Sequence, residues 1–257
     1  MTLLKNLTNL LLLECKDCLI THCNLSQNNV RLVTITGSLT KQVNLNCSSL
    51  TQLKLNGSCV SNVDIYNILQ SHNLRYLWLN HCVITRQSDK IIDWDINSSL
   101  LVLECCESTI DNDLFHSILD KLKLLQHLNL SKSSLNKINI KSDSLLTLDL
   151  SSCHRLKSVQ INSRSLLNIS MLQCSLCENV YINAIGLQKI CLSYCVKLTE
   201  LNLICDSLHQ FYLNFVNIDE EVILKWLIHP QLEIKHVYLS NLLSNFGKEL
   251  PFVIHYE

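Results

Sequence analysis

The chain has 257 residues, 47% of them hydrophobic, which is enough for a sizeable core and excludes a disordered protein. Four Gly and two Pro leave almost no linker material, so we expect a single domain over 1–257. Lys and Arg number 21 against 22 Asp and Glu, without a basic run, which argues against nucleic acid and membrane surfaces as partners.

The amino-terminal segment is apolar but does not have the features of a signal peptide. It runs into Glu14, Lys16 and Asp17 without a small-residue cleavage site. No apolar stretch reaches the roughly 18 to 20 residues that a membrane span requires. We therefore expect an intracellular protein in a reducing compartment, cytoplasmic or nuclear.

An internal repeat dominates the sequence. The segment LLTLDLSSC from Leu145 to Cys153 shows the unit, with apolar residues at positions 1, 4 and 6 and Cys or Ser at position 9. Position 9 is Cys or Ser in all of the first nine units. The units begin at Leu10, Val30, Leu50, Leu74, Ser98, Leu125, Leu145, Leu166, Leu187, Leu208 and Ile234. The position-9 residues are Cys18, Ser38, Ser58, Cys82, Cys106, Ser133, Cys153, Cys174 and Cys195. The count predicts about eleven turns of a solenoid.

The spacing between units predicts two kinds of turn. Where the spacing is 20 or 21 residues, a second copy of the unit follows about ten residues after the first, as in LNKINI from Leu135 and LKSVQI from Leu156. Ten residues accommodate a strand and a bend but not a strand and a helix. The fold class is therefore an α/β solenoid, a right-handed leucine-rich-repeat coil with parallel strands on both faces of the short turns and helices only on the longer ones. We expect helix-backed turns over 50–124, short β-β turns over 125–216, and a helix plus a carboxy-terminal cap over 217–257.

Two helices can be located from their capping residues. Asp111 precedes an apolar stripe at helical spacing, and Asp219 precedes another that stops before Pro230. The stripes consist of Leu114, Phe115, Ile118, Leu119 and Leu122, and of Val222, Ile223, Trp226 and Leu227.

The run LDLSSCHRLKSVQINSRSLLNISMLQCSLCENVYI, with Leu or Ile at 1, 4 and 6 and Cys at 9, resembles the cysteine-containing class of leucine-rich repeats. That class is best known from F-box/leucine-rich-repeat proteins, in which the repeats present substrates to a cullin-type ubiquitin ligase. The resemblance implies a protein-binding role. No F-box is visible and the repeat is already in phase at Leu10, so any contact with the ligase adaptor is expected through a segment that this sequence does not contain.

The cysteines predict core packing, and neither catalysis nor metal binding. Two CxxC pairs exist, Cys15 with Cys18 and Cys174 with Cys177, but the repeat phase points all four inward. Cys153 and His154 are the nearest approach to a catalytic pair, yet neighbours in a strand face opposite sides. We therefore expect no catalytic residue, no metal and no cofactor.

Residues at positions 3, 5 and 7 should face outward, where a solenoid contacts its partner. Tyr76, Trp78, Leu100 and Val102 are predicted to form an apolar patch on adjacent strands. The complete set of predicted partner-binding residues is Tyr76, Trp78, Leu100, Val102, His127, Asp149, Tyr212, His236 and Tyr238.

The leading hypothesis is a non-enzymatic protein-interaction scaffold, with substrate recognition for a cullin-type ligase as its specific form. A second is a secreted or effector-type leucine-rich-repeat recognition protein, stabilised by disulfides or glycosylated. A third is a metal-dependent enzyme. Fourteen cysteines, counted as free thiols in denaturant, would exclude the disulfide-stabilised form.

Overall fold

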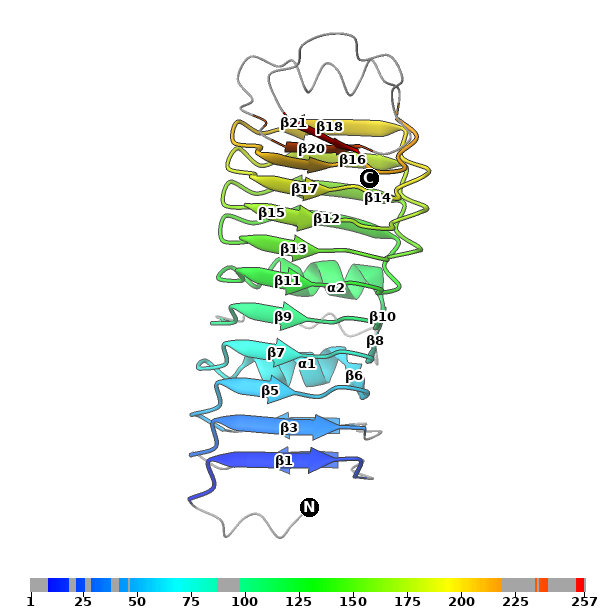
Figure 1. Cartoon of the computed structure of the whole chain (residues 1–257). Helices are drawn as coiled ribbons and strands as arrows, with labels where there is room; N and C mark the ends of the chain where they lie inside the picture. Colours follow the sequence, from blue (N-terminus) through cyan, green and yellow to red (C-terminus); the bar gives the residue numbers. More distant parts are fainter. Residues whose placement is uncertain are drawn as a thin grey trace. The chain divides into compact units, whose positions relative to one another are not determined.

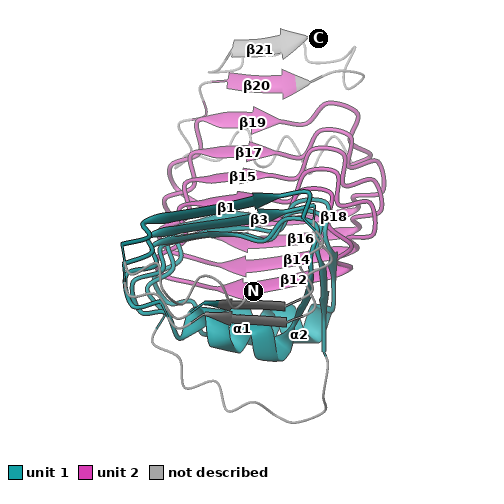
Figure 2. Cartoon of the chain, turned by 90° about the horizontal axis from the view of Figure 1, so that it is seen from below, with its two compact units in different colours: residues 1–129 teal, residues 130–257 magenta. Residues whose placement is uncertain are grey.

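The computed structural model describes residues 9–18, 22–25, 29–37, 42–45, 47–86, 98–218, 234, 236–239 and 253–256. Contacts divide the chain into two compact units, Met1–Asn129 and Leu130–Glu257, which Figure 2 distinguishes by colour.

Unit 1 is built on a ladder of parallel strands. In order across the sheet these are β1 (Leu12–Lys16), β3 (Leu32–Thr36), β5 (Gln52–Lys54), β7 (Tyr76–Trp78), β9 (Val102–Glu104) and β11 (His127–Asn129). Figure 1 shows them as successive rungs. Each odd strand pairs in register with the next odd strand, so each repeat places one rung on the same face.

The other sides of unit 1 follow the turn lengths. The two 20-residue turns carry β2 (His22–Leu25) and β4 (Gln42–Leu45), which pair in parallel and confirm strands on both faces of short turns. The longer turns carry the short strands β6 (Cys59–Ser61), β8 (Val83–Thr85) and β10 (Thr109–Ile110). Helices α1 (Asn62–Leu69) and α2 (Asn112–Leu119) lie opposite β1 and β3 in Figure 2.

Both helices begin at a side-chain cap. The predicted helix after Asp111 is confirmed as α2, where the Leu114 amide donates to the Asp111 carboxylate at 2.8 Å. Helix α1 was not located from the sequence. It begins at a capping box in which the Asp64 amide donates to Ser61 Oγ and the Ser61 amide donates to Asp64 Oδ2. A Ser followed three residues later by an acid was the available signal.

Unit 2 has strands on both faces. One face carries β13 (Thr147–Asp149), β15 (Asn168–Ser170), β17 (Lys189–Cys191), β19 (Gln210–Tyr212), β20 (His236–Leu239) and β21 (Val253–Tyr256). The other carries β12 (Lys137–Lys141), β14 (Ser158–Asn162), β16 (Asn179–Asn183) and β18 (Glu200–Ile204). The predicted β-β turns are confirmed, whereas strand β21 had no counterpart in the repeat count.

One repeat was placed two residues too early. The prediction started a unit at Ser98, which put Leu100 outward and Cys106 at position 9. In the structure Leu100 is completely buried and strand β9 begins at Val102, so the unit starts at Leu100. Position 9 is then Ser108, whose hydroxyl donates to the Leu79 carbonyl at 2.7 Å. The continuous apolar run from Leu100 to Leu103 had allowed both phases.

Two expected helical segments fall outside the described residues. These are the outer part of the turn after β8, at 87–97, and the helix after Asp219. None of the helices in the described ranges is long and apolar enough to cross a membrane.

The core of unit 2 consists of aligned apolar rows. Leu148, Ile169, Ile190 and Phe211 occupy position 4 of successive turns, are paired in register and are at most 2% exposed. Because the strand period is two, this alignment directs positions 3 and 5 to the opposite side.

Position 8 is the most regular feature of the turns. In every described repeat up to Phe215 it has a positive φ, between 51° and 79°. The residues are Asp17, Gly37, Gly57, His81, Glu107, Lys132, Ser152, Gln173, Tyr194 and Phe215. Only two are Gly, so the fold imposes a left-handed conformation on side chains that do not favour it.

We expect Leu148→Asp to unfold unit 2. An unpaired carboxylate in the apolar row carries a desolvation cost that is large beside the roughly 5 to 15 kcal/mol stability of a typical domain. Thermal melting followed by circular dichroism measures the effect. Asn168→Asp, on the outward side of the neighbouring strand, is the control and should melt like the parent. A parental melting curve for Leu148→Asp would contradict the assigned repeat phase.

We expect Lys132→Gly to stabilise the protein by about 1 kcal/mol, because Lys132 has φ of 57° and a left-handed non-Gly residue costs roughly 1 to 2 kcal/mol. The same change at Lys141, in strand β12, should be destabilising because Gly loses more backbone entropy in a strand. Denaturant unfolding should therefore show a higher free energy of unfolding for Lys132→Gly and a lower one for Lys141→Gly. A lower value for Lys132→Gly would show that the contacts of the Lys132 side chain stabilise the turn by more than the left-handed backbone costs.

Candidate binding faces

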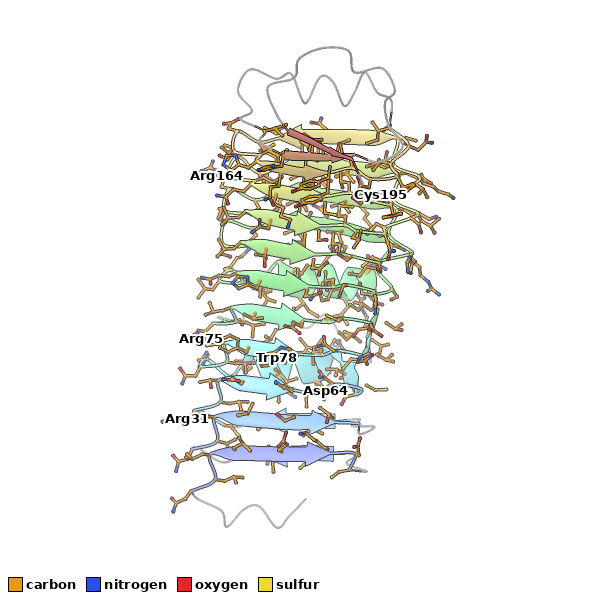
Figure 3. All side chains as sticks on the ribbon, viewed as in Figure 1. Arg31, Asp64, Arg75, Trp78, Arg164 and Cys195 are labelled. Carbon is orange, nitrogen blue, oxygen red and sulfur yellow. The ribbon has the colours of Figure 1, made fainter. Side chains whose placement is uncertain are left out.

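The aromatic face of unit 1, defined here as Lys54, Tyr76, Trp78, Val102 and Glu104, lies on strands β5, β7 and β9. Figure 3 labels Trp78 on β7. The Tyr76 and Trp78 rings are stacked, with centroids 5.8 Å apart and planes 13° apart. Tyr76 is 37% exposed and Trp78 is partly buried. The outward direction predicted for both aromatic residues is therefore what the structure shows.

Strand register places opposite charges on either side of Trp78. Lys54 and Glu104 are its partners on the two neighbouring strands. The Lys54 ammonium lies 4.6 Å from the Trp78 ring centroid, within the range of a cation–π contact. On the other side, the side-chain nitrogen Nδ2 of Asn80 donates to Glu104 Oε2 at 3.3 Å. Trp78 is thus held between two charged side chains, and Glu104 is itself positioned.

An asparagine ladder supports this face from position 7. The Asn80 backbone amide donates to Asn56 Oδ1 at 3.1 Å, and the Cys106 backbone amide donates to Asn80 Oδ1 at 2.8 Å. Asn80 therefore connects three turns, through its backbone amide on one side and its side-chain oxygen on the other. These hydrogen bonds fix the chain directly after β7, the strand that carries the two aromatic residues.

Two further predicted residues of unit 1, Val102 and His127, lie in the same row as Tyr76. Val102 is the register partner of Tyr76, and exposed His127 is the partner of Val102, so both extend the row at position 3. Leu100 is different: it is completely buried and contributes to the core, so the prediction that it joins the exposed patch is wrong. Without Leu100 the aromatic face has less apolar surface than expected.

In unit 2, three predicted residues come together. Tyr212 and Tyr238 are register partners on β19 and β20, and their rings stack with centroids 4.1 Å apart. Lys189 Nζ lies 5.0 Å from the Tyr212 centroid, and His236 on β20 pairs in register with Gln210. This tyrosine pair repeats on a second surface the combination of stacked aromatics and lysine seen around Trp78.

Asp149 does not join the tyrosine pair. It lies on β13, which is separated from β19 by strands β15 and β17. Its carboxylate accepts a hydrogen bond from the Ser151 amide at 2.8 Å, which fixes the end of its own strand. A structural role accounts for this side chain.

Two surfaces of unit 2 were not predicted from the sequence. The first is a groove on the β12-β14-β16-β18 sheet, which lines a volume of about 720 Å³. The second is the stack of Tyr194 on Phe215, 4.8 Å between centroids, at position 8 of adjacent turns. The first depends on which polar residues become neighbours across turns, and the second depends on the left-handed turn. Neither has a signal within a single repeat.

The position-9 thiols form a structural ladder. Cys153 donates to the Leu130 carbonyl at 3.1 Å, Cys174 to Leu150 at 3.0 Å, and Cys195 to Met171 at 3.1 Å. Each acceptor occupies position 6 of the preceding turn. Cys82 in unit 1 makes the same bond to Leu55 at 3.1 Å. The prediction that these side chains point inward is confirmed, and the thiol supplies one hydrogen bond to each buried carbonyl.

Burial makes these thiols poor nucleophiles. It raises the pKa of Cys153 to about 11, and a hydrogen bond with Cys195 together with burial raises the pKa of Cys174 far above its ordinary value. Since the thiolate is the reactive form, neither thiol is activated. His154 is exposed whereas Cys153 is completely buried, so the structure does not bring these two together as a nucleophile and base.

The CxxC pairs differ from each other. Cys174 and Cys177 are both buried, as the repeat phase predicts. Cys18, by contrast, is exposed, so its predicted inward packing is wrong. Cys15 lies on the inward side of β1, in register with completely buried Ile35, but is itself only partly buried. The Cys18 thiol donates to the Lys16 carbonyl of its own turn at 3.2 Å. Among the described residues, no three His, Cys, Asp or Glu side chains converge as metal ligands.

Comparison with known proteins gives similarity to solved structures alone. No protein-family model matches the chain, and no curated protein matches it. An internalin (inlF) from Listeria monocytogenes is similar at 14% sequence identity, with 93% of this chain and 82% of the internalin chain covered and a TM-score of 0.35. The class of the protein rests on its own repeat and strand registers, which define a leucine-rich-repeat solenoid.

We expect Cys174→Ser to be milder than Cys174→Leu. Serine keeps a donor for the Leu150 carbonyl, as Ser108 does for Leu79, while leucine loses the hydrogen bond and overpacks the site at a cost of roughly 1 to 3 kcal/mol. Chemical denaturation of both variants measures the order. If the leucine variant is the more stable one, the thiol ladder does not organise the turns.

Proposed function

We propose that this protein is a non-enzymatic scaffold that binds another protein through the aromatic face of unit 1. The observation that carries the proposal is the stacked Tyr76–Trp78 pair on the outward side of β7. Solenoids of this type bind partners on such faces, and Trp and Tyr are enriched among the residues that dominate binding energy. Neither ring fills the core, so no structural duty explains this pair.

The arrangement of the face favours tight binding. Tyr76 stacks on Trp78 and Lys54 lies over the Trp78 ring, so both aromatic side chains are positioned before a partner arrives. Ordering a flexible side chain on binding costs about 0.5 to 1.5 kcal/mol, and a preorganised side chain avoids part of that cost. A partner that covers the rings therefore gains most of their burial energy.

The charges on the face constrain the partner. Lys54 and Glu104 lie on opposite sides of Trp78 along the direction of the stacked strands. A complementary partner would place an apolar group over the rings, an acidic group beside Lys54 and a basic group beside Glu104. Such complementarity determines orientation and partner choice more than affinity.

The specific role that we infer is substrate recognition for a cullin-type ubiquitin ligase in the cytoplasm or nucleus. It is supported only by the resemblance of the repeat to the cysteine-containing class. Affinity purification from cell extract, followed by identification of bound proteins, tests it. A cullin adaptor among them would support the ligase role, whereas its absence alongside a specific partner would leave the scaffold without that role.

We expect the double variant Tyr76→Ala with Trp78→Ala to bind the partner about a thousandfold more weakly while melting like the parent. Loss of each aromatic anchor at a binding centre typically costs at least about 2 kcal/mol. A pull-down with quantified retention measures binding, and circular dichroism measures the fold.

Tyr212→Ala with Tyr238→Ala is the matched control, because it removes another stacked aromatic pair that lies beside a lysine. It should retain the partner. If the Tyr76 and Trp78 variant still retains the partner and the control variant does not, the binding site is the tyrosine pair of unit 2 and not the aromatic face.

A further inference from the structure

The second sheet of unit 2 has a groove that the proposed function does not use. Strands β12, β14, β16 and β18 line it, and its volume is about 720 Å³. The outward side chains along its floor are almost all polar and include one aromatic ring. They include Lys137, Gln160, Asn179, Tyr181, Glu200 and Asn202.

Strand register sets these side chains in two rows. Gln160, Tyr181 and Asn202 are partners on β14, β16 and β18, so amides flank the tyrosine ring on both sides. Asn179 and Glu200 are partners in the neighbouring row. Parallel strands lie about 4.8 Å apart, so the groove presents a regular array of planar polar groups around one aromatic platform.

The described part of the protein does not use the hydrogen-bonding capacity of this array. Within the part of the chain that the structure describes, the side chains of Gln160, Asn179, Tyr181, Glu200 and Asn202 form no intramolecular hydrogen bond. Tyr181 is half-buried and the other four are exposed. Each amide offers two donors and an acceptor, and the carboxylate offers acceptors alone. A ligand that both donates and accepts at many points would satisfy them.

The lining disfavours a peptide strand as that ligand. Strands β14 and β16 are each paired on both sides, so their backbone has no free edge for an added strand. The apolar residues of the lining, Val159, Val180 and Leu201, are at most 8% exposed and face the core. A peptide side chain would find no apolar pocket here.

We propose that this groove binds a neutral oligosaccharide. Hydroxyl groups on adjacent sugar carbons donate and accept together, which matches amides and a carboxylate, and the C–H face of a pyranose ring matches the Tyr181 ring. Charge supports a neutral ligand, because Lys137 and Glu200 stand at opposite ends of one row and balance each other. Lys137 lies on β12 and Glu200 on β18, so a chain of sugars crossing the strands would contact the whole array.

The experiment screens the full chain on an array of neutral and acidic oligosaccharides, then titrates the strongest neutral ligand by calorimetry. Tyr181→Ala should weaken binding by about tenfold, because it removes the stacking platform. Tyr181→Phe keeps the ring and should stay within about threefold of the parent. Gln160→Ala tests the amide row at an exposed position where the fold is not at stake, and should weaken binding. Tyr212→Ala, on the other sheet, is the control and should leave binding unchanged.

Loss in the alanine variants with retention in Tyr181→Phe supports the proposal, provided that all variants melt like the parent. Three results would overturn it: no neutral oligosaccharide bound, binding of acidic glycans alone, or binding indifferent to both Tyr181→Ala and Gln160→Ala. Competition by an unrelated peptide at the same groove would also overturn it. None of these results depends on Tyr76 or Trp78, so they do not test the proposed scaffold function, which the Tyr76 and Trp78 double variant tests.

Discussion

The left-handed residue at position 8 is the constraint on which each turn depends. Its positive φ turns the chain out of the strand, and its amide donates to the position-7 carbonyl of the following turn, as Ser152 does to Leu172 and Gln173 to Ser193. The next residue, at position 9, is then directed inward. There its thiol or hydroxyl reaches the position-6 carbonyl of the preceding turn, as for Cys174 and Leu150. In the turns that contain Cys82, Cys153, Cys174 and Cys195, this conformation links the turn to both of its neighbours.

This arrangement explains why position 9 is either Cys or Ser. The position-6 carbonyl also accepts the position-9 amide of its own turn, as Leu150 accepts from Cys153 at 3.2 Å, so its second acceptor site requires a small side chain with a donor. Both Cys and Ser meet that requirement. Larger residues would overpack the site, and an apolar one of similar size would leave the carbonyl with one partner.

Because the turn and the ladder maintain the coil, outward residues of the strands are free to serve binding. Positions 3 and 5 carry Tyr76 and Trp78 in unit 1 and Gln210 and Tyr212 in unit 2, without core duty. The in-register stacking then converts single residues into rows. A lysine beside an aromatic residue, or an amide beside a tyrosine, is created by register between turns and not by proximity along the chain.

The sequence by itself determined the solenoid, the two kinds of turn, the inward rows and the helix after Asp111, because each is a periodic or local pattern of side-chain type. It also directed Tyr76 and Trp78 outward, through the inward positions of Leu77 and Leu79. Local patterns were insufficient where a run was apolar at every position. At Leu100–Leu103 two phases were possible, and the contact from Ser108 to Leu79 in the preceding turn selected one.

Only the tertiary structure decided which side chains from different turns become neighbours. The Lys54 contact with Trp78, the stack of Tyr194 on Phe215, and the array around Tyr181 each join residues about 21 to 24 positions apart. Turn length and strand register set these pairs, and an error of one or two residues in either changes every pair along a face. For that reason the outward residues of most turns could be predicted from the sequence, but the contacts between residues of neighbouring turns could not.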